Sequence, residues 1–173
     1  MRWFWIDRFT SFHSGREATA IKNVSLVEEA LDDYCLGYPY LPPPLIIEGL
    51  AQLGGVLVAE HMNFQKRVVL AKVVRAVFHQ LAAPGDQLHY HAVLESVQDE
   101  GAMVSCTSKL HEQPQAEIQL MFAFLNENRF GEMPLFKPEE LTTMLRLMRF
   151  FEVAVDPAGR PLDVTTDRSI SPQ

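Results

Sequence analysis

A proline-rich loop that runs directly into a long apolar segment constrains the fold of this chain more than any other feature. The loop covers residues 34–44 and holds Pro39, Pro42, Pro43 and Pro44. Each of these prolines fixes a φ angle and lacks a backbone donor, so the loop cannot be regular structure. The apolar segment follows over residues 45–62. Because proline is tolerated at the first position of a helix, we predict a helix that starts at Pro43 or Pro44 and ends near Asn63.

The predicted helix carries polar side chains only at Glu48, Gln52, Glu60 and His61. Glu48 and Gln52 are four residues apart, so they share one face of the helix. A helix that is apolar on most of its surface is buried. We therefore expect a buried carboxylate on the first turn, with a raised pKa that makes it a candidate acid or base. The alternative is a structural glutamate near the helix N-terminus, where negative charge is favourable.

Composition narrows the classes of function. A chain of 173 residues with 47% hydrophobic residues can form one domain with a proper core. The net charge of −7 argues against nucleic acid as the main partner. Cys35 and Cys106 lack metal-type spacing and suit free thiols in a reducing cytoplasm. The N-terminus becomes charged too soon for a signal peptide, and glycines interrupt the apolar segment, so we predict a core helix and no membrane span.

The remaining periodicity predicts an antiparallel sheet. Residues 1–15 are expected to be an irregular lead-in, and Glu17 to Ser25 alternates as a strand with Ala18, Ala20 and Lys22 on one face. After the helix, turn residues separate four strand candidates, at residues 68–81, 87–97, 102–110 and 116–125. This order predicts an α+β fold in which the sheet wraps around one helix. Its sheet edges would invite pairing with a second subunit.

The composition changes after residue 126. We predict a domain over residues 1–126 and a C-terminal extension over residues 127–173. Within the extension, leucine, methionine and phenylalanine recur at helical spacing, which predicts a docking helix over about residues 138–152. Residues 156–173 are polar with three prolines and are expected to be a flexible tail.

Three blocks resemble the 3-hydroxyacyl-ACP dehydratases of the FabZ/FabA type, which have the hot-dog fold. The first joins Trp5-Ile6-Asp7-Arg8 to Ala20-Ile21-Lys22-Asn23-Val24-Ser25, and the second is Leu45-Ile46-Ile47-Glu48-Gly49-Leu50-Ala51-Gln52. The third is Phe78 followed by Ala83-Pro84-Gly85-Asp86-Gln87-Leu88. The three occur in the family's order, and the resemblance covers roughly residues 3–125.

The resemblance implies a helix carboxylate, a histidine base and a backbone N–H that polarises the thioester carbonyl. The carboxylate falls on Glu48, beside the matching Gln52. The histidine position, fourteen residues before Glu48, is Tyr34 in this chain, and only Gly37 remains of the family's His-Phe-Pro-Gly loop. The glycine that supplies the N–H is replaced by Pro43, which has none. Tyrosine, with a pKa of about 10, is a poor base but can donate a hydrogen bond.

Three functions stay open: a dehydratase or hydratase in which Glu48 and Tyr34 are catalytic, a catalytically silent acyl-binding or partner subunit, and a hot-dog thioesterase that uses Glu48. The resemblance implies substrate-binding roles for Gly37, Pro43, Gln52, Phe78 and His79. It implies an acyl-ACP or acyl-CoA thioester as substrate, no cofactor or metal, and a homodimer or a hexamer built as a trimer of dimers. Acidic ACP would need a basic patch, for which Lys66, Arg67, Lys72 and Arg75 are the candidates.

Overall fold

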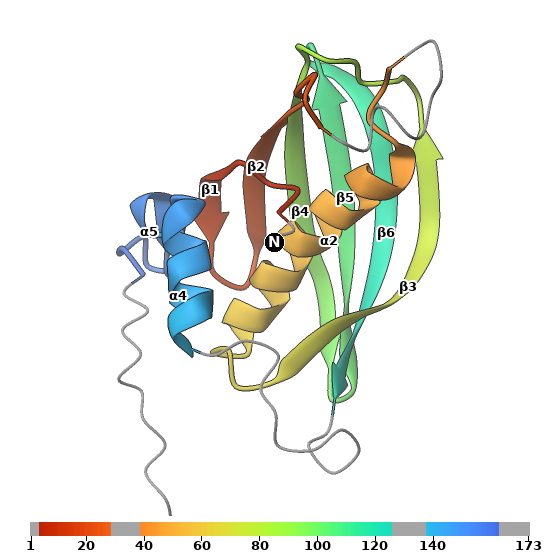
Figure 1. Cartoon of the computed structure of the whole chain (residues 1–173). Coiled ribbons are helices and arrows are strands. Elements are labelled where there is room, and N and C mark those ends of the chain that lie inside the picture. The colour runs from red at the N-terminus through yellow and green to blue at the C-terminus, as the bar shows by residue number, and fades with distance from the viewer. Residues whose placement is uncertain (1–3, 29–38, 126–137, 163–173) are drawn as a thin grey trace, which may run out of the picture.

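One curved sheet and one long helix form the centre of the molecule (Figure 1). The computed structural model describes residues 4–28, 39–125 and 138–162. Its sheet has seven strands in the order β3-β6-β5-β4-β2-β1-β7, and the neighbours pair antiparallel except for the parallel pair of β1 and β7. The strands are β1 (Arg8–His13), β2 (Glu17–Asn23), β3 (Arg67–Phe78), β4 (Gln87–Gln98), β5 (Gly101–Leu110), β6 (Gln113–Leu125) and β7 (Ala154–Val155).

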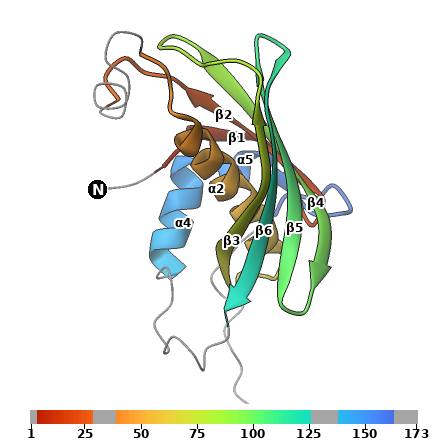
Figure 2. The ribbon, with the colours of Figure 1, turned by 90° about the vertical axis from the view of Figure 1, so that its right-hand side faces the viewer.

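Helix α2 (Pro43–His61) lies across the inner face of this sheet, which curves around it (Figure 2). Its start at Pro43 confirms the prediction. It ends at His61, and Asn63 and Phe64 follow with positive φ angles of 53° and 56°, which stop helical geometry. The buried side of α2 packs against alternate residues of the strands, including Leu88, Val104 and Leu120. Among the described residues, no helix is long and apolar enough to cross a membrane.

Strand β1 lies inside the stretch that was predicted to be irregular, so that prediction was wrong. The two buried aromatic residues of β1 are Phe9 and Phe12, which are three residues apart rather than two or four. A register shift between Phe9 and Ser11 explains this spacing, because a β-bulge inserts one extra residue into the strand. The bulge therefore hid the alternation from the sequence pattern.

The turn expected between the strand candidates 102–110 and 116–125 is also placed differently. His111 and Glu112 have positive φ angles of 50° and 62° and form the two-residue connection of a hairpin. Leu110 pairs with Gln113 and Lys109 with Pro114, so β6 begins before the proline. A register shift near Lys109 accommodates Pro114 within the strand.

The C-terminal extension packs onto β1 rather than standing apart from the sheet (Figure 1). It forms α4 (Pro138–Leu147) and α5 (Phe150–Val153) instead of one helix, because Arg149 adopts the left-handed conformation with a φ of 58°. Phe150 is buried, with its ring centroid 5.4 Å from that of Phe9 and 4.6 Å from that of Phe12. Leu145 and Met148 are buried in the same core, and β7 extends the sheet beyond β1.

The flexible tail was predicted to start at Asp156, and that boundary is too early. The Asp156 carboxylate accepts hydrogen bonds from the backbone N–H groups of Ala158 and Arg160, at 2.8 and 2.9 Å. The N–H of Leu162 donates to Ala154, which closes this turn onto β7. The domain boundary predicted near residue 126 falls at the edge of residues 126–137, which are outside the described part of the chain.

Candidate active site

Glu48 and Gln52 lie one turn apart on α2 and are in direct contact. The side-chain amide of Gln52 donates a hydrogen bond from Nε2 to Glu48 Oε1 at 3.0 Å. Since the helix begins at Pro43, Glu48 lies in its second turn rather than in its first. Its side chain is half-buried rather than buried, as seen in the single chain. Both expectations about its depth and position are thus corrected, and the dipole at the helix start acts on it more weakly than predicted.

Prolines occupy the start of this helix and remove its first donors. Pro42 is the N-cap, and Pro43 and Pro44 are the first two helical residues. The first N–H after them belongs to Leu45, and it donates to the carbonyl of Pro42 at 2.9 Å. Pro43 therefore has no N–H to offer at the start of the helix.

The chain segment before β1 lies against the same face of α2. The backbone N–H of Trp5 donates to Gln52 Oε1 at 2.9 Å, so the Gln52 amide is held on both of its polar atoms. Gly49 makes this approach possible, since a Cβ there would lie 2.6 Å from the Trp5 carbonyl oxygen and 2.7 Å from Tyr90 Cε2. Burial raises the pKa of Tyr90, and the nearby carboxylates of Asp7 and Glu28 raise it further, so its hydroxyl stays neutral.

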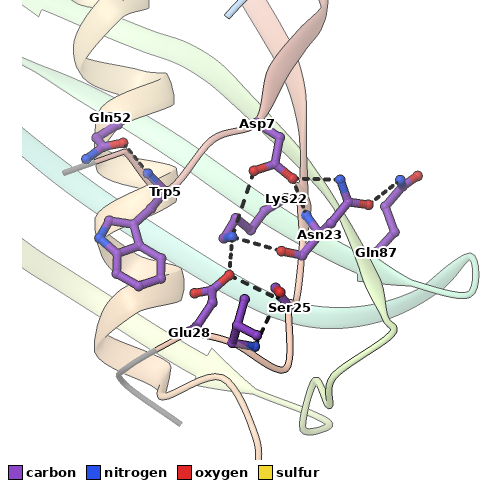
Figure 3. A network of polar contacts seen from close by, with 9 residues as sticks. Trp5, Asp7, Lys22, Asn23, Ser25, Glu28, Gln52 and Gln87 are labelled. Atoms are coloured by element: carbon purple, nitrogen blue, oxygen red, sulfur yellow. Dashed lines mark hydrogen bonds and ion pairs between the residues drawn. The ribbon is translucent and has the colours of Figure 1, made fainter. Parts of the chain in front are cut away.

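Lys22 is a buried charge that the sequence analysis did not single out. It is 6% exposed and its ammonium group makes ion pairs with Glu28 and Asp7. It also lies 5.5 Å from the centre of the Trp5 ring (Figure 3). The signal was present in the strand pattern, because Lys22 falls in register with the buried Ala18 and Ala20. A lysine on a buried face needs charged partners, so this register predicts acidic residues close to Lys22.

A comparison with protein families gives this geometry its context. The family model described as FabA-like domain matches residues 3–114. The chain belongs to this family. The match ends before α4, so the C-terminal extension lies outside the FabA-like part, as the predicted resemblance also had it.

A curated relative agrees with this membership, and solved structures share the fold. The 3-hydroxyacyl-[acyl-carrier-protein] dehydratase FabZ of Pelotomaculum thermopropionicum is 35% identical over 119 residues, which are 68% of this chain and 85% of that protein. A chain of the dehydratase heterocomplex ApeI:P from Xenorhabdus doucetiae superimposes with a TM-score of 0.60 at 14% identity, over 83% of this chain and 90% of that one. The smu.793 protein of Streptococcus mutans, solved with bound acetyl CoA, has a TM-score of 0.59 at 15% identity, over 73% and 94%. The fold of this FabA-like protein is the predicted hot-dog fold.

The other predicted site residues divide into two groups. Tyr34, Gly37 and Cys35 lie outside the described residues. Phe78 is half-buried against the core at the end of β3, while His79 is exposed and its Nε2 lies 3.3 Å from Glu117 Oε1. The described partner of His79 is thus on β6 and not on α2.

Two further side chains of reactive type, His91 and Cys106, have ordinary structural contacts. His91, which alternates with His89 on β4, lies 3.1 Å from Glu17 on the neighbouring strand. Cys106 is buried in the core, and this burial raises the pKa of its thiol to about 12. A thiol that stays protonated at neutral pH is a weak nucleophile, so Cys106 is part of the packing.

Proposed function

We propose that this FabA-like protein binds acyl thioesters of 3-hydroxyacyl-ACP or enoyl-ACP type, or their CoA equivalents, and acts on them as a dehydratase or hydratase of weakened activity. The observation that carries the proposal is the Glu48 carboxylate on α2, which accepts a hydrogen bond from Gln52 at 3.0 Å and to which the resemblance assigns the acid's role. Family membership and the dehydratase relative at 35% identity support the thioester class.

In this proposal the Glu48 carboxylate accepts the α-proton of the 3-hydroxyacyl thioester and then gives that proton to the hydroxyl group, which leaves as water, and hydration runs the same transfers in reverse. Such a proton transfer requires a carboxyl group held within hydrogen-bond reach of the reacting oxygen. Gln52 fixes one carboxylate oxygen of Glu48, which leaves the other for the substrate. Tyr34 takes the place of the histidine base and donates a hydrogen bond to the substrate oxygen, and Gly37, Phe78 and His79 contribute to substrate binding.

The replacements at positions 34 and 43 set the level of activity. The loss of one oxyanion donor costs about 100- to 1000-fold in other enzymes, and the loss of a general base costs about 100-fold or more. Pro43 at the first helical position has no N–H, so the first of these losses applies directly to this chain. The same loss weighs against a thioesterase, because that reaction also needs a polarised carbonyl.

A catalytically silent partner subunit is the second candidate function. The two replacements favour it, since both remove groups that act on the same transition state. A solved neighbour of this chain is part of a dehydratase heterocomplex, which gives a precedent for pairing within this fold. In this alternative the chain would bind acyl groups or an active homologue without turnover.

The edge strand β3 is the proposed contact with a second copy. It forms one edge of the sheet, and its large apolar side chains Leu70, Val73 and Val74 are 39%, 37% and 40% exposed. An exposed apolar edge strand favours pairing with another chain. We propose a homodimer through this edge, with a trimer of dimers as the further assembly. Lys66, Arg67, Lys72 and Arg75 stand on or beside the same strand and form the proposed docking patch for acidic ACP.

The deciding experiment is a hydration assay on enoyl thioesters of several chain lengths, each presented on CoA and on ACP. We expect slow hydration that disappears in Glu48→Gln, while release of free thiol stays at background. Thiol release that depends on Glu48 would instead identify a thioesterase. Tight acyl-thioester binding without turnover on any substrate would establish the silent subunit and refute the dehydratase proposal.

A further inference from the structure

The polar residues around Lys22 connect three separate segments of the chain at one point (Figure 3). Lys22 comes from β2, Asp7 from the segment before β1, and Glu28 from the segment after β2. The Lys22 ammonium group donates to the carbonyl of Asn23 at 2.8 Å and pairs with both carboxylates. Because a buried ammonium group must be paired, these contacts fix the three segments relative to one another.

The Asp7 side of this cluster is fixed by further hydrogen bonds. Asp7 Oδ2 accepts from the backbone N–H and from the side-chain amide of Asn23, each at 2.6 Å. The Asn23 side chain in turn accepts from Gln87 Nε2 at 2.7 Å, and the backbone N–H of Asp7 donates to Ile21 at 2.9 Å. The segment before β1 is therefore anchored at Asp7, two residues after Trp5.

Trp5 transmits this anchoring to the helix. Its ring faces Lys22 at 5.5 Å, a distance at which a cation is attracted to an aromatic face. Its backbone N–H donates to Gln52 Oε1, and Gln52 Nε2 donates to Glu48 Oε1. The Trp5 N–H and the Glu48 carboxylate together fix which way the Gln52 amide points, because a reversed amide would place its NH₂ group against a donor and its oxygen against a carboxylate oxygen.

We propose that Lys22 is a positioning residue for Glu48. It acts through Trp5 and Gln52, by holding the segment before β1 where the Trp5 N–H orients the Gln52 amide toward the carboxylate. The role of Lys22 in catalysis rests on the proposed function. Its role in orienting the Gln52 amide does not depend on that function. Glu28 forms an ion pair with Lys22 and so contributes to the same positioning.

The test uses Lys22→Met, which keeps the length of the side chain and removes its charge. The matched control is Lys109→Met, the same change at an exposed lysine on the outer face of β5. In nitrogen-15 NMR spectra the side-chain amide of Gln52 is assigned by its loss in Gln52→Leu. We expect its two amide proton resonances to shift in Lys22→Met toward their positions in Glu48→Ala, and to stay in place in Lys109→Met.

Kinetics supply the second measurement. If the enoyl thioester is turned over, Lys22→Met should lower kcat by about 10- to 100-fold with little change in KM, since a misplacement of about 1 Å can cost about 100-fold. Lys109→Met should leave both constants unchanged. If no thioester is turned over, the proposed function fails, while the NMR comparison still decides the role of Lys22.

A variant that misfolds would hide the effect, so Glu28→Gln provides an independent change. It keeps the shape of the side chain and weakens the ion pair of Lys22. We expect a smaller shift of the Gln52 amide resonances in the same direction. Unchanged Gln52 resonances in folded Lys22→Met, or in Glu28→Gln if Lys22→Met does not fold, would overturn the proposal.

Discussion

The two ends of helix α2 each carry a half-buried glutamate, and their surroundings differ in kind. At the N-terminal end, Glu48 is held by Gln52, which is itself held by the Trp5 N–H. At the C-terminal end, Glu60 Oε1 accepts a hydrogen bond from Ser14 Oγ at 2.9 Å, in the turn between β1 and β2. Its Oε2 atom is buried without a hydrogen-bond partner among the described residues. Burial raises the pKa of Glu60, and the Ser14 hydrogen bond partly opposes this rise.

A carboxyl group with a raised pKa is the usual sign of a catalytic acid. Burial raises the pKa of Glu60, and its carboxylate holds the turn between β1 and β2 against the end of the helix. The chain of hydrogen bonds from the Trp5 N–H through Gln52 ends at Glu48, the proposed acid. The comparison teaches that a raised pKa by itself does not identify a catalytic acid, because Glu60 has one and its contact is with a hairpin turn. Each prediction below tests one side of this difference.

The largest effect on activity is expected from restoring the histidine and the glycine that Tyr34 and Pro43 replace near the start of α2. Tyr34→His alone should recover little dehydratase activity, because the enolate oxygen would still lack its backbone donor. The double change Tyr34→His with Pro43→Gly returns both groups, which act as a unit. It should raise kcat/KM by more than the product of the single gains, and by about 100-fold or more in total. The kcat/KM values of the single and double variants are measured by enoyl-thioester hydration.

The control for that experiment is the wild type itself. If the wild type already hydrates enoyl thioesters at a rate normal for the family, then Tyr34 or His79 supports a working mechanism. The interpretation of positions 34 and 43 as losses would then be refuted.

Glu48→Gln and Glu60→Gln form the direct test of the two ends. Any hydration activity should fall by about 100- to 10,000-fold in Glu48→Gln, since a proton donor is removed. It should persist in Glu60→Gln, because that carboxylate lies at the other end of the helix. Rates on one enoyl thioester and the thermal midpoints of both variants are compared. If both variants fold and lose activity equally, the assignment of Glu48 as the catalytic carboxylate and of Glu60 as a structural one is wrong.

Much of this arrangement follows from the sequence, and the exceptions have physical causes. Proline fixed the start of α2, and the spacing of four residues placed Glu48 beside Gln52. The bulge at β1 hid a strand, and the left-handed Arg149 split a helix that its apolar spacing had joined. The contact from Trp5 to Gln52 joins residues 47 apart and uses a backbone N–H, which no side-chain pattern reveals.

Two helical glycines test the packing of each half of the helix. Gly49→Ala should lower the free energy of unfolding by roughly 1–3 kcal/mol, because its Cβ would lie 2.6 Å from the Trp5 carbonyl oxygen and force the helix or the segment before β1 to move. Gly55→Ala is the control, since its Cβ would meet Phe122 Cε1 at an ordinary 3.5 Å. It should stabilise the protein by up to about 1 kcal/mol through helix propensity. Urea unfolding of both variants measures this, and equal costs would contradict the tight approach at Gly49.

The smallest expected effect is a pH dependence of stability that comes from Glu60. Because the pKa of Glu60 is raised by burial in the folded chain, the folded state binds its proton more tightly than the unfolded state does. The free energy of unfolding should therefore fall as the pH rises from about 4.5, the ordinary value for glutamate, through the raised value. Glutamine resembles the protonated acid, so Glu60→Gln should remove this part of the decline and leave the protein slightly more stable at pH 7. Solvent screening of the half-buried group limits the difference to within about 1 kcal/mol. Urea unfolding of wild type and variant between pH 4 and pH 8 measures it, and parallel profiles would show that Glu60 titrates alike in both states.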